Sequence, residues 1–282
     1  VLTHGHQDHF GLARRIADRG KAKLFGGRRD GRAFRMERRG RRILDEMARA
    51  GFGVATRLAV TASVAWVDRF AEPLREWDAL EGGEVLPGDG YTLRVGAAPG
   101  HTPGSLVFEL PEVNVLFTGD TILHRITPNA VVMEDPERKG EIFRSLSRYR
   151  ETLDAVERSN GSSRLLTGHG EAIDDFPTHR REVERRYVER RRAIEQALSE
   201  GPLTVRDIGE KLFPKGNALG AFLVFSELTG FLMAMEDEGR VEKLEGRVTT
   251  RYALRKPSTS PPPDAREVRS PRPAPAPARS RA

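Results

Sequence analysis

The most informative stretch of the chain reads Thr3-His4-Gly5-His6-Gln7-Asp8-His9. In an extended segment side chains alternate, so His4 and His6 point to the same side. If His4 and His6 bind one metal ion, a turn into a following helix would place Asp8 and His9 beside the position of a second ion. One loop can therefore serve two metal ions about 3.5–4 Å apart. The alternative is a solvated polar loop, but four such ligands at this spacing rarely coincide.

Further candidate ligands lie at expected strand ends or turns. They are His101 in Pro99-Gly100-His101-Thr102-Pro103-Gly104-Ser105, Asp120 in Phe117-Thr118-Gly119-Asp120-Thr121, and His169 in Gly168-His169-Gly170. The glycines and prolines suit tight turns that aim a side chain into a cleft. The chain has no cysteine, which excludes disulfides, thiolate ligands and a cysteine nucleophile. Imidazole and carboxylate ligands without thiolate suit Zn, Fe or Mn.

The length and net charge of the chain limit its number of domains and its partners only broadly. A chain of 282 residues fits one large domain, or one large and one small domain. The net charge is +6, and residues 255–282 hold seven basic residues against two acids, a net of +5. Basicity is therefore a weak indication of a nucleic-acid partner. The lack of cysteine agrees with a reducing compartment, and we expect a cytoplasmic protein.

The pattern of apolar residues predicts alternating helices and strands up to residue 177. The expected elements are a strand end at 1–2, a helix at 10–18, a strand at 23–25, β structure at 84–110, strands at 113–118 and 164–167, and a helix at 141–157. Residues 27–80 are predicted to be a helical insertion, with a helix over 55–76. Its arginine-rich part, 28–49, is either a solvated helix face or a contact for RNA or an anionic substrate.

The character of the sequence changes after residue 177. Helices are expected at 178–200, 203–213 and 218–238, followed by two strands within 241–254. This is the element order of a winged helix. Residues 218–235 are apolar enough to suggest a membrane span, but Glu227 in their middle favours a buried helix and no membrane. The proline-rich basic tail, 255–282, is expected to be disordered.

The ordered set HGHQDH, PGHTPGS, FTGDT and GHG resembles the metallo-β-lactamase superfamily. The resemblance implies an α+β class and a four-layer αββα fold over 1–177, followed by a small winged-helix domain over 178–254. It places His4, His6 and His101 on a first metal ion. It places Asp8, His9 and His169 on a second, with Asp120 as the bridge. The cofactors would be two divalent ions, zinc first, with iron or manganese as alternatives.

The identity of the bridging residue narrows the resemblance. The commonest true β-lactamases carry cysteine at the position of Asp120. The full histidine and aspartate set resembles glyoxalase II, the ribonuclease Z group and relatives that carry a winged helix, such as β-lactamase-like protein 2. It implies hydrolysis by a water that two metals activate, with Asp8 and Asp120 as catalytic residues. Hydroxyl groups that orient the ligands through hydrogen bonds are expected from Thr3, Thr102, Ser105 and Thr118.

Three functions stay open at this point. The first is a hydrolase of small thioesters, esters or lactones, similar to hydroxyacylglutathione hydrolase. The second is a metal-dependent endoribonuclease, and the third is a non-catalytic binding protein. A small-molecule substrate is the expected partner, with nucleic acid not favoured and a homodimer as a further alternative. The substrate, the native metal and the oligomeric state do not follow from the sequence.

One departure from the family stands out. Such domains have several strands before the histidine loop, and here they are missing. We therefore expect an N-terminally incomplete fragment with exposed apolar surface and an open strand edge, which folds poorly alone.

Overall fold

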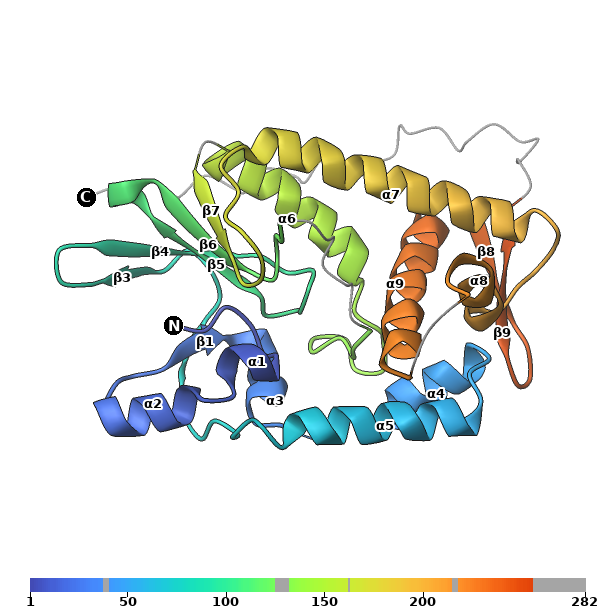
Figure 1. Cartoon of the computed structure of the whole chain (residues 1–282), viewed down its shortest axis with the longest axis horizontal. Helices are drawn as coiled ribbons and strands as arrows, with labels where there is room; N and C mark the ends of the chain where they lie inside the picture. Colours follow the sequence, from blue (N-terminus) through green and yellow to red (C-terminus); the bar gives the residue numbers. More distant parts are fainter. Residues whose placement is uncertain (38–40, 125–131, 162, 215–217, 256–282) are drawn as a thin grey trace, which may run out of the picture.

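The computed structural model describes residues 1–37, 41–124, 132–161, 163–214 and 218–255 (Figure 1). All but the first residue of the expected tail over 255–282, and a small part of the arginine-rich stretch, lie outside these residues. The elements up to the five-stranded sheet are α1 (Gln7–Phe10), α2 (Ala13–Gly20), β1 (Phe25–Gly27), η1 (Arg28–Asp30), α3 (Gly31–Phe34), α4 (Arg41–Arg49), α5 (Val54–Asp68) and β2 (Asp78–Leu80). The remaining ones are β3 (Val85–Pro87), β4 (Thr92–Ala97), β5 (Leu106–Leu110), η2 (Pro111–Val113), β6 (Val115–Gly119), α6 (Ser145–Asn160), β7 (Arg164–Thr167), α7 (Phe176–Leu198), α8 (Val205–Leu212), α9 (Ala218–Asp237), β8 (Val241–Glu245) and β9 (Thr250–Leu254).

The largest of the described sheets has five strands in the order β3-β4-β5-β6-β7 and lies toward one end of the structure (Figure 1). Neighbours from β3 to β6 are antiparallel, and β6 and β7 are parallel with α6 as their connection. Parallel strands end at the same edge of a sheet. The residues that follow β6 and β7, Asp120 and Gly168, are therefore brought together, and the Gly168 N–H donates to the Gly119 carbonyl at 2.8 Å.

A second, smaller sheet pairs β1 with β2 in parallel. The chain before α1 runs between the two sheets. The Leu2 N–H donates to the Phe25 carbonyl, and the Thr3 carbonyl accepts from the Leu106 N–H, both at 2.8 Å. The predicted strand end at residues 1–2 is wrong, because single backbone hydrogen bonds to β1 and to β5 do not form the repeated pairing of a β-strand. The segment nevertheless ties β1 to β5 directly before the histidine loop.

Two predicted helices, one before β1 and one between β1 and β2, differ from their expected lengths. The helix predicted over 10–18 is broken at Gly11 and Leu12, between α1 and α2. A Cβ on Gly11 would lie 3.1 Å from the Ala71 Cβ and 2.4 Å from the Gln7 carbonyl oxygen. The helix predicted to reach residue 76 ends at Asp68. Beyond it the Glu72 N–H donates to Gly11, and the Leu74 N–H donates to Phe34. Bonds to earlier loops thus replace the helical ones.

Helix α7 begins at Phe176, inside the expected catalytic domain of 1–177. The Asp175 carboxylate accepts a hydrogen bond from the Thr178 N–H at 2.9 Å and caps the helix. Pro177 suits the first turn, where its missing N–H costs nothing. Figure 1 shows α7 lying along α6. Helix α9 contacts α6, and its Phe231 stacks on Tyr187 of α7 with the ring centroids 5.1 Å apart.

The last elements follow in the order that the sequence predicts. Helices α8 and α9 precede the antiparallel β8-β9 hairpin, and Leu203 exchanges two backbone hydrogen bonds with Tyr252 of β9. One hydrophobic core runs from Leu116 and Leu165 of the sheet to Phe225 of α9. Helix α9 is buried through much of its length, and no helix among the described residues is long and apolar enough to cross a membrane.

Candidate metal centre

The histidine loop brings its first two imidazoles against a third. His4 is buried, and its Nε2 lies 3.1 Å from the Nδ1 of His6. His101, in the turn between β4 and β5, places its Nε2 2.9 Å from the same His6 nitrogen. Helix α1 begins directly after His6, so the next two ligand candidates stand on a helical turn, as the sequence predicts. These three histidines form the first group of the cluster.

The second group lies where α1 meets the end of β7. The Nε2 of His169 lies 3.1 Å from the Oδ2 of Asp8 and 3.3 Å from the Nε2 of His9. Asp120 stands between the two groups. Its carboxylate lies 3.2 Å from His9, 3.4 Å from His169 and 3.7 Å from His101. All seven residues that the sequence singles out therefore meet at one sheet edge.

The cluster fits divalent cations. The potential ligand atoms form three overlapping sets, and within each set they lie no more than 4.8 Å apart. The sets are His4, His6 and His101; His4, His9 and Asp120; and Asp8, His9 and His169. The Oδ1 atom of Asp120 is buried and accepts no hydrogen bond of good geometry, although His9 is near. A Cβ on Gly168 would lie 2.2 Å from that oxygen, so only glycine leaves room there. An orphaned carboxylate oxygen among imidazoles is what a bound cation would satisfy.

Burial and neighbouring charges set the protonation of the cluster. Burial, followed by repulsion from four other histidines, holds the pKa of His4 well below its ordinary value. Burial also opposes charge on His9 and Asp120, but the attraction between the two groups, 3.2 Å apart, outweighs it. The pKa of His9 is raised as a result, and that of Asp120 is lowered. A neutral His4 keeps the lone pair that a metal ligand needs.

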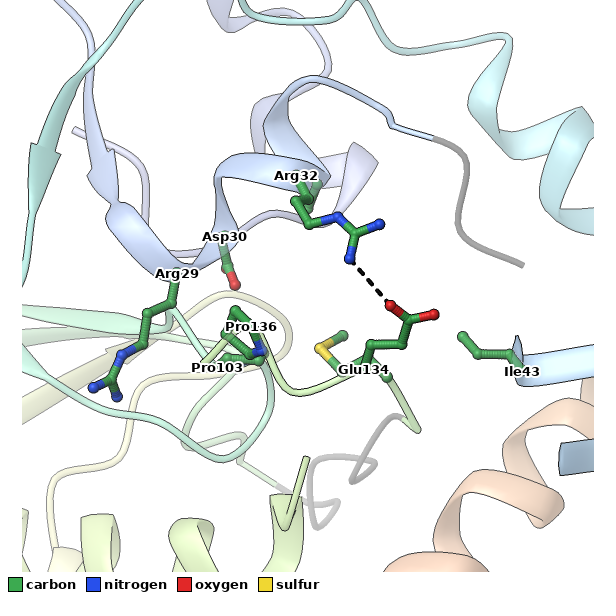
Figure 2. Close-up of a pocket in the computed structure, with 9 residues that line it drawn as sticks. Arg29, Asp30, Arg32, Ile43, Pro103, Glu134 and Pro136 are labelled. Carbon is green, nitrogen blue, oxygen red and sulfur yellow. Dashed lines mark hydrogen bonds and ion pairs between the residues drawn. The ribbon is translucent and has the colours of Figure 1, made fainter. Parts of the chain in front are cut away.

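A buried aspartate that the sequence analysis missed joins two of the ligand loops. Asp30 is 3% exposed and accepts hydrogen bonds from the Gly5 N–H at 2.8 Å, the Thr102 hydroxyl at 2.6 Å and the Gly104 N–H at 2.9 Å. Figure 2 shows Asp30 beside Pro103. Asp30 follows two arginines in the run Arg28-Arg29-Asp30, and a run of charged residues is expected to be exposed to solvent. No sequence pattern indicates that Asp30 is buried.

The expected supporting hydroxyls divide into two kinds. Thr3 contacts a ligand directly, with its Oγ1 3.1 Å from the Nδ1 of His4. Thr102 acts through Asp30 and also meets the Ser105 hydroxyl at 2.8 Å. The Thr118 hydroxyl instead donates to the Ile122 carbonyl at 3.0 Å. It holds the turn that carries Asp120 rather than a ligand side chain.

The described arginines of the arginine-rich stretch near the site form ion pairs with acidic residues. Arg32 reaches Glu134 at 3.1 Å across a cavity of about 60 Å³, as Figure 2 shows. Arg29 pairs with Glu137 at 2.5 Å, and Arg28 pairs with Glu81. These pairs tie the arginine-rich stretch to other parts of the chain. They favour its interpretation as a solvated face over a contact for RNA or an anionic substrate.

The fold and the ligand cluster together define the metallo-hydrolase class. The chain belongs to the metallo-beta-lactamase superfamily, whose family model matches residues 1–195. The resemblance to this superfamily seen in the sequence is thereby confirmed. Members of this superfamily are mostly hydrolases and typically bind divalent metals.

Individual relatives are more distant. The chain is 32% identical over 122 residues to hydroxyacylglutathione hydrolase GloC of Haemophilus influenzae, which covers 43% of this chain and 48% of that protein. It thus spans about half the length of that relative. It is 26% identical over 254 residues to the probable metallo-hydrolase YqjP of Bacillus subtilis, covering 84% and 74%.

Solved structures agree on the fold. A beta-lactamase domain protein from Burkholderia ambifaria superposes with a TM-score of 0.76 at 22% identity, covering 90% of this chain and 74% of that one. A metallo-beta-lactamase family protein from Thermus thermophilus gives a TM-score of 0.71 at 25% identity, covering 90% and 78%.

Proposed function

We propose that this protein hydrolyses a small thioester, ester or lactone with the help of two divalent ions, zinc first. The seven-residue cluster carries the proposal, because its histidines and aspartates fall into two groups around Asp120. The likeness to the hydroxyacylglutathione hydrolase of Haemophilus influenzae supports the choice of substrate class.

The proposed mechanism gives separate tasks to the two aspartates. His4, His6 and His101 would hold one ion, and Asp8, His9 and His169 the other, with Asp120 between them. When bound, such ions lower the pKa of a water and polarise the bond under attack. The side chain of Asp8 is 59% exposed, so it borders the space from which a substrate approaches. We assign the carboxylate oxygen of Asp8 that is not needed to hold the ion to orient the attacking water and take up its proton, which then passes to the departing thiolate or alkoxide. Asp120, which is buried, fixes the positions of His9 and His169.

We further propose that the elements after residue 178 form a winged-helix domain that shapes the site and does not read DNA. The pairing of Leu203 with Tyr252 adds a single β-bridge to the β8-β9 hairpin, at the position where winged helices place a third short strand. Helix α9 shares the core of the sheet and faces the same cavity as His101 and His169. Because α9 is largely buried, it is poorly placed to enter a groove of DNA.

The test is turnover by the full chain loaded with zinc or manganese. We expect it to hydrolyse an acetyl thioester, and Asp8→Asn to lose about 100-fold or more of kcat, since a base within reach of the reacting water contributes that much. Asp89→Asn, in an exposed turn, is the matched control and keeps full activity. A fully metallated chain that cleaves RNA but no thioester, ester or lactone would replace this proposal with the endoribonuclease alternative.

A further inference from the structure

We propose that the open cavity lined by α6, α7 and α9 binds an apolar acyl chain, so that the substrate is a thioester or ester of a medium-chain acid. This inference rests on the proposed function and deepens it. The cavity has a volume of about 820 Å³, within the range of small-molecule sites. His101, Asp120 and His169 form part of its wall. A chain lodged in it would hold its carbonyl end at the metal centre.

The wall away from the metal ligands is largely apolar. Leu146 and Leu153 of α6, Val183 of α7 and Phe231 of α9 line it, and each is buried in the structure. Leu123, after the turn of Asp120, continues this surface toward the ligands. Contact with such a surface stabilises each buried methylene of a ligand. A small polar acyl group would leave most of this volume to water.

The charged residues of the cavity are already paired. Arg180 contacts Asp154 at 2.9 Å and Glu184 at 3.1 Å. Arg190 contacts Glu227 at 2.7 Å. The other lining arginines are also paired, Arg150 with Glu184 at 3.4 Å and Arg186 with Glu182 at 2.9 Å. An anionic ligand such as a phosphodiester would have to displace these carboxylates, whereas a neutral chain would not. The pairing therefore favours an apolar occupant.

One unpartnered donor lies on the same wall. Tyr149 of α6 is buried, and its hydroxyl has no hydrogen-bond partner among the described residues. Burial raises the pKa of this hydroxyl far above its ordinary value, so it stays protonated and can donate. The residue packs beside the turn of His101: a Cβ on Gly100 would lie 2.6 Å from the Tyr149 Cα. The hydroxyl oxygen is itself inaccessible in the structure, so a substrate oxygen would satisfy it only after a shift of the lining side chains.

The test compares thioesters of one thiol, N-acetylcysteamine, with acetyl, butanoyl, hexanoyl and octanoyl groups, using the zinc-loaded full chain. We expect kcat/KM to rise about threefold to fourfold per added methylene until the cavity is filled. Leu153→Trp and Ala193→Phe both add bulk to the lining. Each is expected to lower the ratio of octanoyl to acetyl kcat/KM by about tenfold or more. Leu58→Trp, at an exposed site on α5, is the control and leaves the ratio unchanged.

A binding measurement separates this inference from the proposed function. Calorimetry with octanoate needs no turnover, and Ala193→Phe, at a half-buried position, is the variant less disturbing to the core. Binding that Ala193→Phe weakens about tenfold supports the acyl pocket even if no thioester is cleaved. A flat chain-length series together with no octanoate binding would overturn the pocket, even if acetyl thioester hydrolysis upholds the function.

Discussion

The carboxylate of Asp30 accepts a hydrogen bond from the backbone N–H of Gly5, in the middle of the histidine loop, at 2.8 Å. The same side chain binds Thr102 and Gly104 around His101. One buried aspartate therefore fixes two ligand loops that are about a hundred residues apart in the sequence, and the geometry of the first group depends on it.

We expect Asp30→Ala to lower the free energy of unfolding by about 2–3 kcal/mol, because it leaves buried donors without an acceptor. Zinc affinity is expected to fall about 10-fold to 100-fold, as for other residues that orient ligands. Urea unfolding and zinc titration measure the two effects. Asp18→Ala, at an exposed position on α2, is the matched control. Unchanged zinc affinity in folded Asp30→Ala would contradict the positioning role.

Asp120→Ala removes the carboxylate that stands between the two ligand groups. We expect the variant to retain one ion fewer per chain and to lose about 100-fold or more of turnover. Metal analysis of the dialysed protein and a thioester assay give the two readouts. A variant with full metal content and full turnover would show that Asp120 is not the bridge.

The space beside Asp120 exists because residue 168 is a glycine, which has no side chain. Gly168→Ala would place a Cβ 2.2 Å from the Asp120 Oδ1 and 2.8 Å from the His9 Cε1. We expect this methyl group to displace both ligands and weaken zinc binding about 10-fold or more. Gly53→Ala, where a Cβ meets nothing within 4 Å, is the control. Equal zinc affinity in both variants would argue against close packing around Asp120.

The cap of α7 makes stability depend on pH. Hydrogen bonds from the Thr178 side chain and backbone hold the pKa of Asp175 below its ordinary value. A lowered folded pKa contributes stability above the unfolded pKa, and this is lost as pH falls through the folded value. Asp175→Asn should therefore lower Tm at pH 7, and the difference should shrink as the pH falls below about 4. Thermal melts across this range measure it, and a Tm difference that grows on acidification would be the wrong sign.

The sequence predicted the parts of the site that are local or lie at strand ends. His4 to His9 form one loop, and Asp120 and His169 follow strands whose parallel pairing brings them together. The role of Asp30 could not be predicted, because its partners lie in loops that only the folded chain places around it. The end of α5 was missed for the same reason, since backbone bonds from Glu72 and Leu74 to earlier loops replace helical ones.

Zinc stoichiometry tests the central claim most directly. The full chain, loaded with excess zinc and dialysed, should retain two ions by elemental analysis. His6→Ala and His169→Ala, one from each ligand group, should each retain about one. An unsubstituted chain that is folded and retains no zinc, or variants that retain as much as it does, would contradict a dinuclear centre built from these seven residues.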